Sequence, residues 1–561
     1  MTALLQVKNL RTWFETDRGT VKSVDGISFE VKKGEIMGLV GESGSGKSIT
    51  GFSLIGLIDK PGKIQPGSSI RFEGRELVDL SETELRSIRG REIAMVFQDP
   101  MMTLNPVLKI IDQIAMAIRA HEKVSDAEVR RRAIEALAMV RIVDPEKKVD
   151  QYPHQFSGGM RQRVAIAIAL LHKPKLVIAD EPTTALDVSV SAEILKEMKA
   201  LVAELGISMI WISHDLATVA SISQKIAVMR LGKIVEMGSV AEVLGAPKHP
   251  YTQGLLDALP ARKKPGELLT SSVTENSGPL VIEGLEAGKS GAPNPHFVKV
   301  QDVDMIYRRP VGAMERFARR LGLAKPPQSV HAVKSASFTI ARGEVLGLVG
   351  ESGSGKSTIG RIICGIDSPT SGAVLIDGAR IRENDRKIGT SVQMIFQDPF
   401  ASLNPRRTIF QAVAEGPIAH GLCSKSNARD YVNRWLRAVA FDPDLSDRYP
   451  HQFSGGQRQR VAIARALAMQ PELIVCDEPV ASLDVSIQAQ VINLLLTLKN
   501  SLDLTLLFIS HDLSVVRHLC DRVIVMHHGK IVEEGAVAEI FEHPKQNYTA
   551  MLLDAIPKLA W

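Results

Sequence analysis

The stretch Gly41-Glu42-Ser43-Gly44-Ser45-Gly46-Lys47-Ser48 decides the fold of this chain, and it recurs unchanged as Gly350-Glu351-Ser352-Gly353-Ser354-Gly355-Lys356-Ser357. Each copy follows a short apolar segment, Gly-Leu-Val, at 38–40 and 347–349. In such a loop the glycines let backbone N–H groups converge on a phosphate, the lysine neutralises charge, and the serine hydroxyl can hold Mg²⁺. The two copies therefore predict two nucleotide-binding domains of the α/β class.

The repeat extends well beyond the loop. The same groups follow it in the same order, namely Gln98, Ser157-Gly158-Gly159, Asp180-Glu181 and His214 in the first copy and Gln397, Ser454-Gly455-Gly456, Asp477-Glu478 and His511 in the second. From the serine to the histidine the two copies stay 297 residues apart (454 − 157; 511 − 214). Between lysine and glutamine the first copy takes 51 residues (98 − 47) and the second 41 (397 − 356). A kept spacing indicates a rigid framework, and a variable one indicates surface loops.

Bulk composition limits the class of protein. A length of 561 residues exceeds one core, and 45% hydrophobic with 23% charged residues is typical of a globular protein. The N-terminus lacks the pattern of a signal peptide, and no apolar run approaches the roughly 18 residues of a membrane helix. The net charge of +5 is too mild to indicate nucleic-acid binding. The four cysteines form no CxxC pair, so we expect buried, reduced thiols rather than a zinc, iron–sulfur or disulfide framework.

Composition also places the domain boundaries. We expect a first domain at 1–259, a flexible linker rich in Ser, Gly, Glu and Pro at 260–296, and a second domain at 297–561. The stretch 308–330 carries six Arg and Lys residues. A solvated basic segment is the favoured interpretation, with contact to lipid headgroups as the alternative.

Two apolar segments in each copy are predicted to be buried strands. They are 175–180 and 207–213 in the first copy, and 472–477 and 504–510 in the second. Near-continuous apolar strands alternating with helical stretches indicate a mainly parallel sheet covered on both faces. Because the acids and histidines follow these strands, they should meet at the carboxyl edge of the sheet, where α/β proteins bind ligands.

The acids that end the first of these strands suggest phosphate chemistry. Asp180 and Asp477 are expected to hold the hydration shell of Mg²⁺, and Glu181 and Glu478 could accept a proton from the attacking water or orient it. The Ser-Gly-Gly motifs precede helical stretches, so they could present N–H groups to an anion or serve only as helix caps.

Taken together, these motifs resemble those of the ATP-binding-cassette (ABC) ATPases over nearly the whole chain except the linker. The resemblance implies two tandem cassettes, each with a mainly parallel sheet flanked by helices, an antiparallel β part and a helical subdomain. It also implies ATP and Mg²⁺ as cofactors, and head-to-tail pairing of the chain's own two cassettes. Each ATP would lie between the phosphate loop of one cassette and the Ser-Gly-Gly signature of the other.

Carried over residue by residue, the resemblance implies two composite sites. The first would use Gly41, Ser43, Gly44, Gly46, Lys47, Ser48, Gln98, Asp180, Glu181 and His214 with Ser454, Gly456 and Gln457. The second would use Gly350, Ser352, Gly353, Gly355, Lys356, Ser357, Gln397, Asp477, Glu478 and His511 with Ser157 and Gly159. The glutamates would promote water attack, the histidines would contact the γ-phosphate, and the glutamines, with the loop serines and the aspartates, would serve Mg²⁺. Phe14 and Tyr307 match the aromatic that stacks on adenine.

The first copy departs from the family pattern at Met160, where the signature usually ends in glutamine, as it does at Gln457. Methionine cannot hydrogen-bond like an amide. Both glutamates are kept, so we expect two working sites.

Longer sequence motifs restrict the resemblance to one branch of the family. Tyr152-Pro-His-Gln-Phe-Ser-Gly-Gly, His249-Pro-Tyr-Thr-Gln and Tyr449-Pro-His-Gln-Phe-Ser-Gly-Gly look like the two ATPase subunits of dipeptide and oligopeptide importers, fused as in glutathione- and microcin-type systems. This implies an ATPase that drives solute import from the cytoplasmic face of a bacterial inner membrane. Its implied partners are two transmembrane permease subunits and, indirectly, an extracytoplasmic solute-binding protein, with no nucleic acid. The permeases would contact the segments after Gln98 and Gln397.

Two other readings stay open. A tandem cassette could be a soluble ATPase acting on ribosomes or DNA, or it could serve an exporter. The Gly/Pro-rich linker disfavours the soluble ATPase, because translation-type tandem cassettes usually join their halves by a long, charged helical linker. The importer-like motifs disfavour the exporter. The transported solute cannot be read from the ATPase alone.

Overall fold

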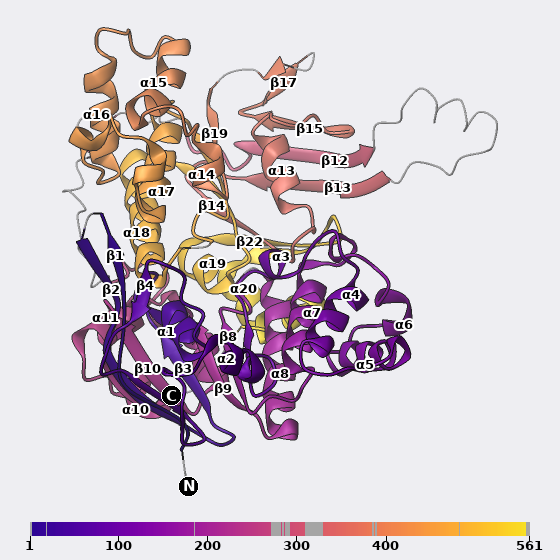
Figure 1. Ribbon diagram of the computed structural model, residues 1–561. Coiled ribbons are helices and arrows are strands. Elements are labelled where there is room, and N and C mark those ends of the chain that lie inside the picture. Colours follow the sequence, from indigo (N-terminus) through magenta and orange to yellow (C-terminus); the bar gives the residue numbers. More distant parts are fainter. Residues whose placement is uncertain are drawn as a thin grey trace. The chain divides into compact units, whose positions relative to one another are not determined.

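A computed structural model describes residues 3–17, 19–184, 186–270, 282, 285, 292–308, 329–383, 386–387, 390–481 and 483–556. Within these residues the chain forms two compact units, one running to Leu256 and the other from Asp257 to Ile556 (Figure 1). No helix in the described ranges combines the length and the apolar character that crossing a membrane requires. Of the basic stretch 308–330, residues 309–328 lie outside the described ranges.

The core of the first unit is a six-stranded sheet in the order β11-β10-β3-β9-β8-β7. Its strands are β3 (Ile36–Val40), β7 (Ile93–Val96), β8 (Leu176–Asp180), β9 (Ser208–Ser213), β10 (Lys225–Arg230) and β11 (Lys233–Ser239). All neighbours are parallel except β10 and β11. Strands β3, β8 and β9 are buried along their full length, as the continuous apolar runs predict.

Helices cover both faces of this sheet. Met37 and Leu39 of β3 point into the core that also contains Leu54 of α1 (Lys47–Leu54). Gly38 between them faces the other way, where a Cβ would lie 2.1 Å from Val219 of α9 (Leu216–Ile222). The alternation of side chains along a strand thus places the two helices on opposite faces.

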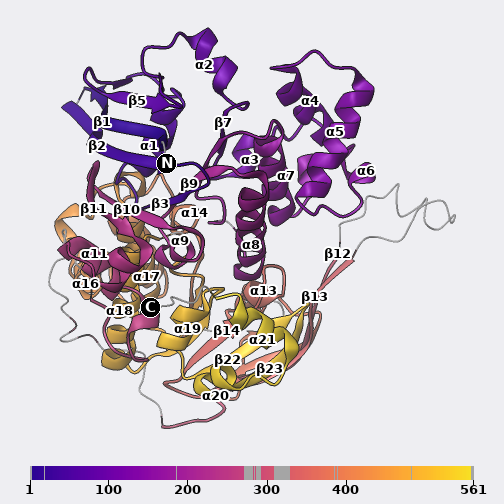
Figure 2. The same cartoon turned by 90° about the horizontal axis from the view of Figure 1, so that it is seen from below.

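A second, antiparallel sheet lies against α1, and a helical part completes the unit. The sheet has the order β2-β1-β5-β6 with β4 beside β1: β1 (Ala3–Thr16), β2 (Gly19–Lys32), β4 (Gly62–Ile64), β5 (Ser69–Phe72) and β6 (Arg75–Glu76). The helical part comprises α3 (Pro100–Thr103), α4 (Ile110–Arg119), α5 (Asp126–Met139), α6 (Pro145–Lys148) and α7 (Gly158–Leu170). Figure 2 shows α4–α6 gathered at one end of this unit and β1, β2 and β5 at the other. The long α8 (Val188–Leu205) and the short α10 (Val240–Gly245) and α11 (Pro250–Asp257) follow.

The second unit repeats this plan. Its main sheet has the order β19-β20-β21-β14-β22-β23, and its antiparallel sheet the order β13-β12-β15-β16. The strands are β12 (Val298–Arg308), β13 (Ser329–Ile340), β14 (Val345–Val349), β15 (Ser371–Ile376), β16 (Ala379–Arg380), β19 (Val392–Ile395), β20 (Leu473–Asp477), β21 (Thr505–Ile509), β22 (Arg522–His527) and β23 (Lys530–Ala536). The helices are α13 (Lys356–Ile363), α14 (Pro399–Ser402), α15 (Ile409–Ala419), α16 (Ala428–Ala438), α17 (Gly455–Leu467), α18 (Val485–Leu502), α19 (Leu513–Leu519), α20 (Val537–Glu542) and α21 (Asn547–Asp554). The predicted fold class is confirmed.

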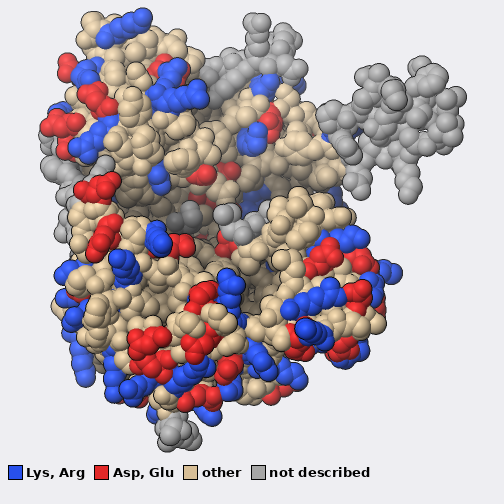
Figure 3. Space-filling view, in the orientation of Figure 1, with Lys and Arg blue, Asp and Glu red and all other residues tan. Residues whose placement is uncertain are grey.

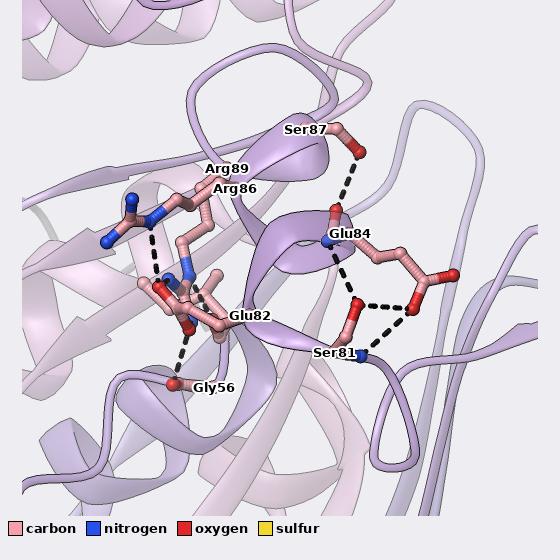
Figure 4. Close-up of polar contacts among 8 residues, drawn as sticks. Gly56, Ser81, Glu82, Glu84, Arg86, Ser87 and Arg89 are labelled. Atoms are coloured by element: carbon pink, nitrogen blue, oxygen red, sulfur yellow. Dashed lines mark hydrogen bonds and ion pairs between the residues drawn. The ribbon is translucent and has the colours of Figure 1, made fainter.

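The first copy is ten residues longer between its loop lysine and its glutamine, and the two units differ in structure in this region. The first unit inserts α2 (Glu82–Ile88), whose start is closed by a reciprocal pair between Ser81 and Glu84 (Figure 4). Arg89 then donates to the carbonyls of Ile55 and Gly56 at 2.7 and 2.8 Å.

The second unit has the short hairpin of β17 (Arg382–Glu383) and β18 (Arg386–Lys387) in place of α2. From it Arg382 donates to the carbonyls of Gly365 and Ile366 at 2.6 and 3.1 Å. An arginine thus binds the end of the loop helix in both units, although different elements carry it.

The first part of the predicted linker, 260–270, contacts the second unit. A one-turn helix, η2 (Pro260–Arg262), packs on α19, and the chain beyond it is hydrogen-bonded to the second unit. Asn493 of α18 accepts from the Leu269 N–H at 2.8 Å and donates to its carbonyl at 2.7 Å, and Leu269 is buried. Buried apolar contact and paired backbone groups outweigh the Pro/Gly-rich composition here. Most of 271–291 lies outside the described ranges.

The surface of the helical part carries both signs of charge. Figure 3 shows Lys and Arg interspersed with Asp and Glu over α5 and α6. Several of them form ion pairs, such as Arg131 with Glu135 at 2.6 Å and Arg130 with Asp150 at 2.8 Å. Exposed pairs of this kind contribute little to stability.

Candidate nucleotide sites

Each phosphate loop joins the end of a central strand to a helix, β3 to α1 and β14 to α13. Gly46 and Gly355 precede the helices in a left-handed conformation, with φ of 100° and 104°. A Cβ at Gly46 would lie 2.1 Å from the Ser23 carbonyl oxygen, and one at Gly355 would lie 2.4 Å from that of Ala332. Only glycine fits these two positions, so the sequence fixes the path of the loop.

The loop lysines are buried and point back along their own loops. Lys47 donates to the carbonyls of Gly41 and Glu42, both at 2.8 Å. Lys356 donates to those of Gly350 and Glu351 at 2.8 and 2.9 Å. Both lysines are 5% exposed, so each ammonium is held inside the curve of its loop.

The serine after each lysine meets the acid that ends the neighbouring strand. Ser48 Oγ donates to Asp180 Oδ1 at 3.0 Å, and Ser357 Oγ donates to Asp477 Oδ1 at 2.9 Å. Burial raises the pKa of Asp180 to about 6, and it raises that of Asp477 as well. A hydroxyl and a buried carboxylate at the helix start form an all-oxygen set, which suits Mg²⁺.

The next glutamate, the loop glutamine and the histidine form a second cluster. Glu181 lies 3.2 Å from His214 Nδ1 and accepts from Gln98 Nε2 at 3.0 Å. In the second unit Glu478 lies 3.3 Å from His511 Nδ1 and accepts from Gln397 Nε2 at 2.7 Å. The three groups come from the ends of β7, β8 and β9 and of their counterparts, as predicted for the acids and histidines from the apolar runs before them.

These contacts keep the glutamates ionised. Burial acts to raise the pKa of Glu181, but His214, Lys47 and Thr184 outweigh it, so the pKa lies below its ordinary value. The pKa of Glu478 is lowered in the same way by His511, Lys356 and Gln397. Glu181 and Glu478 also sit at φ of 46° and 48°, a strained backbone conformation for a non-glycine residue.

The signature serines begin the long helices α7 and α17. Ser157 Oγ accepts from the Met160 N–H, and Ser454 Oγ accepts from the Gln457 N–H, each at 3.3 Å. Gly159 and Gly456 lie in the first turn, where a Cβ would come within 2.5 Å of Val190 and Ile487. Gln457 also accepts from the Ser454 N–H at 3.1 Å. Met160 has no group for that bond, so the predicted departure at this position has a structural consequence.

The two aromatic residues expected at adenine differ in exposure. Tyr307 lies next to the last residue of β12 and is 41% exposed, and its hydroxyl donates to Asp367 Oδ2 at 3.2 Å. Phe14 in β1 is half-buried, and its ring lies beside Gly62, where a Cβ would come within 2.6 Å of it. The loop residues Ser43, Gly44, Ser352 and Gly353 are exposed.

Two tyrosines that we did not predict as site residues lie beside the loops. The Tyr251 hydroxyl accepts from the Glu42 N–H, and the Tyr548 hydroxyl accepts from the Glu351 N–H, each at 3.2 Å. Tyr251 belongs to the His249-Pro-Tyr-Thr-Gln motif, which was the only signal in the sequence.

The four cysteines are buried, as expected. They are Cys364, Cys423, Cys476 and Cys520.

Comparison with known proteins places these sites in a family. The ABC transporter family model matches residues 24–184 and 333–481. The model for the C-terminal region of oligopeptide/dipeptide transporters matches residues 235–284 and 532–560.

Curated relatives match along the whole chain. The glutathione import ATP-binding protein GsiA of Pectobacterium atrosepticum is 41% identical, with 99% of this chain and 89% of that protein covered. GsiA of Escherichia coli K12 is 42% identical at the same coverage. The peptidoglycan transport ATP-binding protein YejF of Agrobacterium fabrum is 41% identical, with 98% and 96% covered.

Proposed function

The chain belongs to the ABC transporter family, and we propose that it is the ATP-hydrolysing subunit of an importer for short peptides or peptide-derived solutes. The observation that carries the proposal is the presence of a complete set of phosphate-handling groups in both units. Whole-length similarity to import ATP-binding proteins supports the direction of transport.

We propose that Lys47 and Lys356 leave their loop carbonyls to neutralise the β- and γ-phosphates of ATP. The loop N–H groups and the positive end of α1 or α13 then bind the phosphate oxygens. Mg²⁺ fits the hydroxyl–carboxylate pairs Ser48–Asp180 and Ser357–Asp477, with Gln98 or Gln397 nearby, and it would neutralise charge on the transferred phosphoryl group.

Glu181 and Glu478 are positioned to act on water. Their lowered pKa leaves them ionised at neutral pH, so each can accept a hydrogen bond from the water that attacks the γ-phosphate. His214 and His511 lie against these carboxylates, and we propose that they orient them and contact the γ-phosphate.

Completion of each site would require the signature of the opposite unit. Ser454 and Gly456 would join the first loop, and Ser157 and Gly159 the second, with Phe14 and Tyr307 stacking on adenine. Two permease subunits would be moved by this closure through the segments after Gln98 and Gln397. The chain would then act at the cytoplasmic face of the inner membrane, with a binding protein delivering solute from outside.

The proposal is tested by trapping the closed state. The double variant Glu181→Gln, Glu478→Gln is produced in its native cells, isolated from membranes with MgATP, and its companions are identified by mass spectrometry. We expect two polytopic membrane proteins. Recovery of ribosomes, nucleic acid or only soluble proteins would contradict the transport function and favour the soluble tandem ATPase.

A second experiment tests the direction and the solute class. The chain is reconstituted in vesicles with the permeases recovered above. We expect ATP hydrolysis to rise when a solute-binding protein loaded with a short peptide or glutathione is added on the side opposite the ATPase. Stimulation by solute added only on the ATPase side would indicate an exporter instead.

A further inference from the structure

The structure assigns a role to the C-terminal region of each unit: one tyrosine from it, Tyr251 or Tyr548, positions the phosphate loop for nucleotide binding. This inference deepens the proposed function and rests on it, because it concerns the same two loops. Neither the family match nor the predicted site residues name these tyrosines as part of the site.

The tyrosine hydroxyl holds the same peptide group that holds the loop lysine. The Glu42 N–H donates to Tyr251 Oη at 3.2 Å, while the Gly41 carbonyl, which belongs to the same peptide group, accepts from Lys47 Nζ at 2.8 Å. In the second unit the Glu351 N–H donates to Tyr548 Oη at 3.2 Å, and the Gly350 carbonyl of the same peptide group accepts from Lys356 Nζ at 2.8 Å. A rotation of this peptide would therefore break the tyrosine contact and move the partner of the lysine together.

The first tyrosine is fixed in its place from several sides. Tyr251 is 2% exposed, and the Arg230 guanidinium lies 4.9 Å from its ring centre. The Glu42 carboxylate also interacts electrostatically with the Tyr251 hydroxyl. Because burial and that carboxylate raise the tyrosine pKa, the hydroxyl keeps its proton and can donate to the carboxylate while accepting from the amide.

A glutamate on the last strand sets the start of the helix that carries the tyrosine. Glu236 of β11 accepts from the N–H groups of Lys248 and His249 at 2.7 and 3.2 Å, just before α11 begins. His249 Nδ1 accepts from the Tyr251 N–H at 3.1 Å. The start of α11 is thus bound to the edge strand β11, and from this helix the Tyr251 side chain reaches the phosphate loop.

The second unit keeps the glutamate and the tyrosine, but the residues before and beside the tyrosine differ. Glu533 accepts from the N–H groups of Lys545 and Gln546 at the same distances, 2.7 and 3.2 Å. His527 stacks on the Tyr548 ring with centroids 3.9 Å apart. The His-Pro before the first tyrosine is replaced by Gln546-Asn547. Within one chain, therefore, two different helix starts deliver a tyrosine hydroxyl to the same loop amide.

The test compares this tyrosine with another buried tyrosine of the same chain. Tyr251→Phe removes only the hydroxyl, and Tyr431→Phe is the matched control, because its hydroxyl donates to the Ala468 carbonyl at 2.6 Å in the helical part of the second unit. Both are made in the full chain carrying Lys356→Ala, so that the first loop dominates binding, and MgADP is titrated calorimetrically. One net hydrogen bond corresponds to a loss of affinity of about threefold to tenfold. We expect that loss for Tyr251→Phe and an unchanged Kd for Tyr431→Phe, whereas equal Kd values would overturn the inference.

A nucleotide-free measurement separates this inference from the proposed function. Hydrogen exchange of the amides in 41–46 is followed by mass spectrometry, and we expect faster exchange there in Tyr251→Phe and not in Tyr431→Phe. Unchanged exchange overturns the positioning role, whether or not the chain binds MgADP. Failure of the unmodified chain to bind MgADP would instead overturn the proposed function. If Tyr251→Phe does not fold, Tyr548→Phe in a Lys47→Ala background gives the same comparison for the second loop.

Discussion

The two cassettes of this chain agree closely in their phosphate-handling groups and differ where the signature helix begins. The serine–aspartate contacts are 3.0 and 2.9 Å, and the glutamate–histidine contacts are 3.2 and 3.3 Å. At the signature, Gln457 closes a reciprocal hydrogen-bonded cap with Ser454, whereas in the first unit the Ser157 side chain accepts from the Met160 N–H and Met160 returns no side-chain bond. Groups at the ends of adjacent strands are fixed by the sheet, while a helix start depends on its own few residues. The two halves can therefore diverge at the start of the signature helix without any change in the phosphate-handling groups.

The largest expected effect concerns the agreement between the cassettes. Glu181→Gln and Glu478→Gln each remove the ionised carboxylate, which is worth on the order of 100-fold or more for a general base. We expect the double variant to lose at least about 100-fold in phosphate release. The unmodified chain has the glutamate and the histidine in both sites, so we expect both sites to contribute. Each single variant should therefore lose at least about half of the activity. If one single variant keeps full activity, the site it alters does not contribute, and the two cassettes are not equivalent.

A second comparison uses the segment 260–270, which packs on the second unit. Asn493 binds both backbone groups of Leu269, while the residue 297 positions earlier is the exposed Lys196. Asn493→Ala leaves two buried backbone groups unpaired, so we expect a loss of about 1–3 kcal/mol in the free energy of unfolding of the second unit. Chemical denaturation measures it, with Lys196→Ala as the control that should lie within about 0.5 kcal/mol of the unmodified chain. Equal stability of both variants would show that the segment is not held by Asn493.

We expect pH to affect the stability of the second unit through His518, which contacts the same segment, 260–270. Burial lowers the pKa of His518, outweighing its contact with the Glu267 carbonyl at 2.8 Å, and the first unit has Ser221 at this position. A histidine whose folded pKa lies below 6.5 binds protons more readily in the unfolded state. Its unit therefore loses stability as pH falls below that value.

Thermal unfolding from pH 7.5 to 5.5 measures this effect. We expect the second unit to lose stability over this range, and His518→Gln to reduce that loss. A pH dependence that is the same in the variant and the unmodified chain would assign it to other groups.

The smallest expected effect tests the signature difference itself. Met160→Gln should add the missing bond to the Ser157 N–H and stabilise the first unit by up to about 1 kcal/mol, and Gln457→Met should destabilise the second by a similar amount. Differential scanning calorimetry of both variants measures the shifts in Tm. Opposite shifts would support the comparison, and shifts of the same sign would refute it.

The parts of the site that could be predicted from sequence are those fixed by strands and glycines. Asp180, Glu181 and His214 follow continuous apolar runs, so parallel pairing brought them to one edge of the sheet, and the loop glycines allowed a single path. The difference of ten residues before Gln98 also pointed to the region where α2 stands. The mainly parallel sheet followed from the same patterns, whereas the antiparallel part and the helical subdomain were implied by the family resemblance alone.

Other features depend on tertiary contacts that composition cannot reveal. The segment 260–270 reads as a linker because Pro and Gly are frequent, yet Leu269 is buried and paired through Asn493, which is 224 residues away. The approach of Tyr251 to Glu42 likewise joins residues 209 positions apart. No periodicity in either segment encodes such contacts, although the His-Pro-Tyr motif marked the region.

The most direct test of the account is the number of nucleotides that one chain traps. Native mass spectrometry of the double variant Glu181→Gln, Glu478→Gln with MgATP would count them and give the mass of the assembly. We expect one chain, paired within itself, holding two ATP molecules. A chain that holds a single ATP, or two chains that must associate before any ATP is trapped, would contradict it.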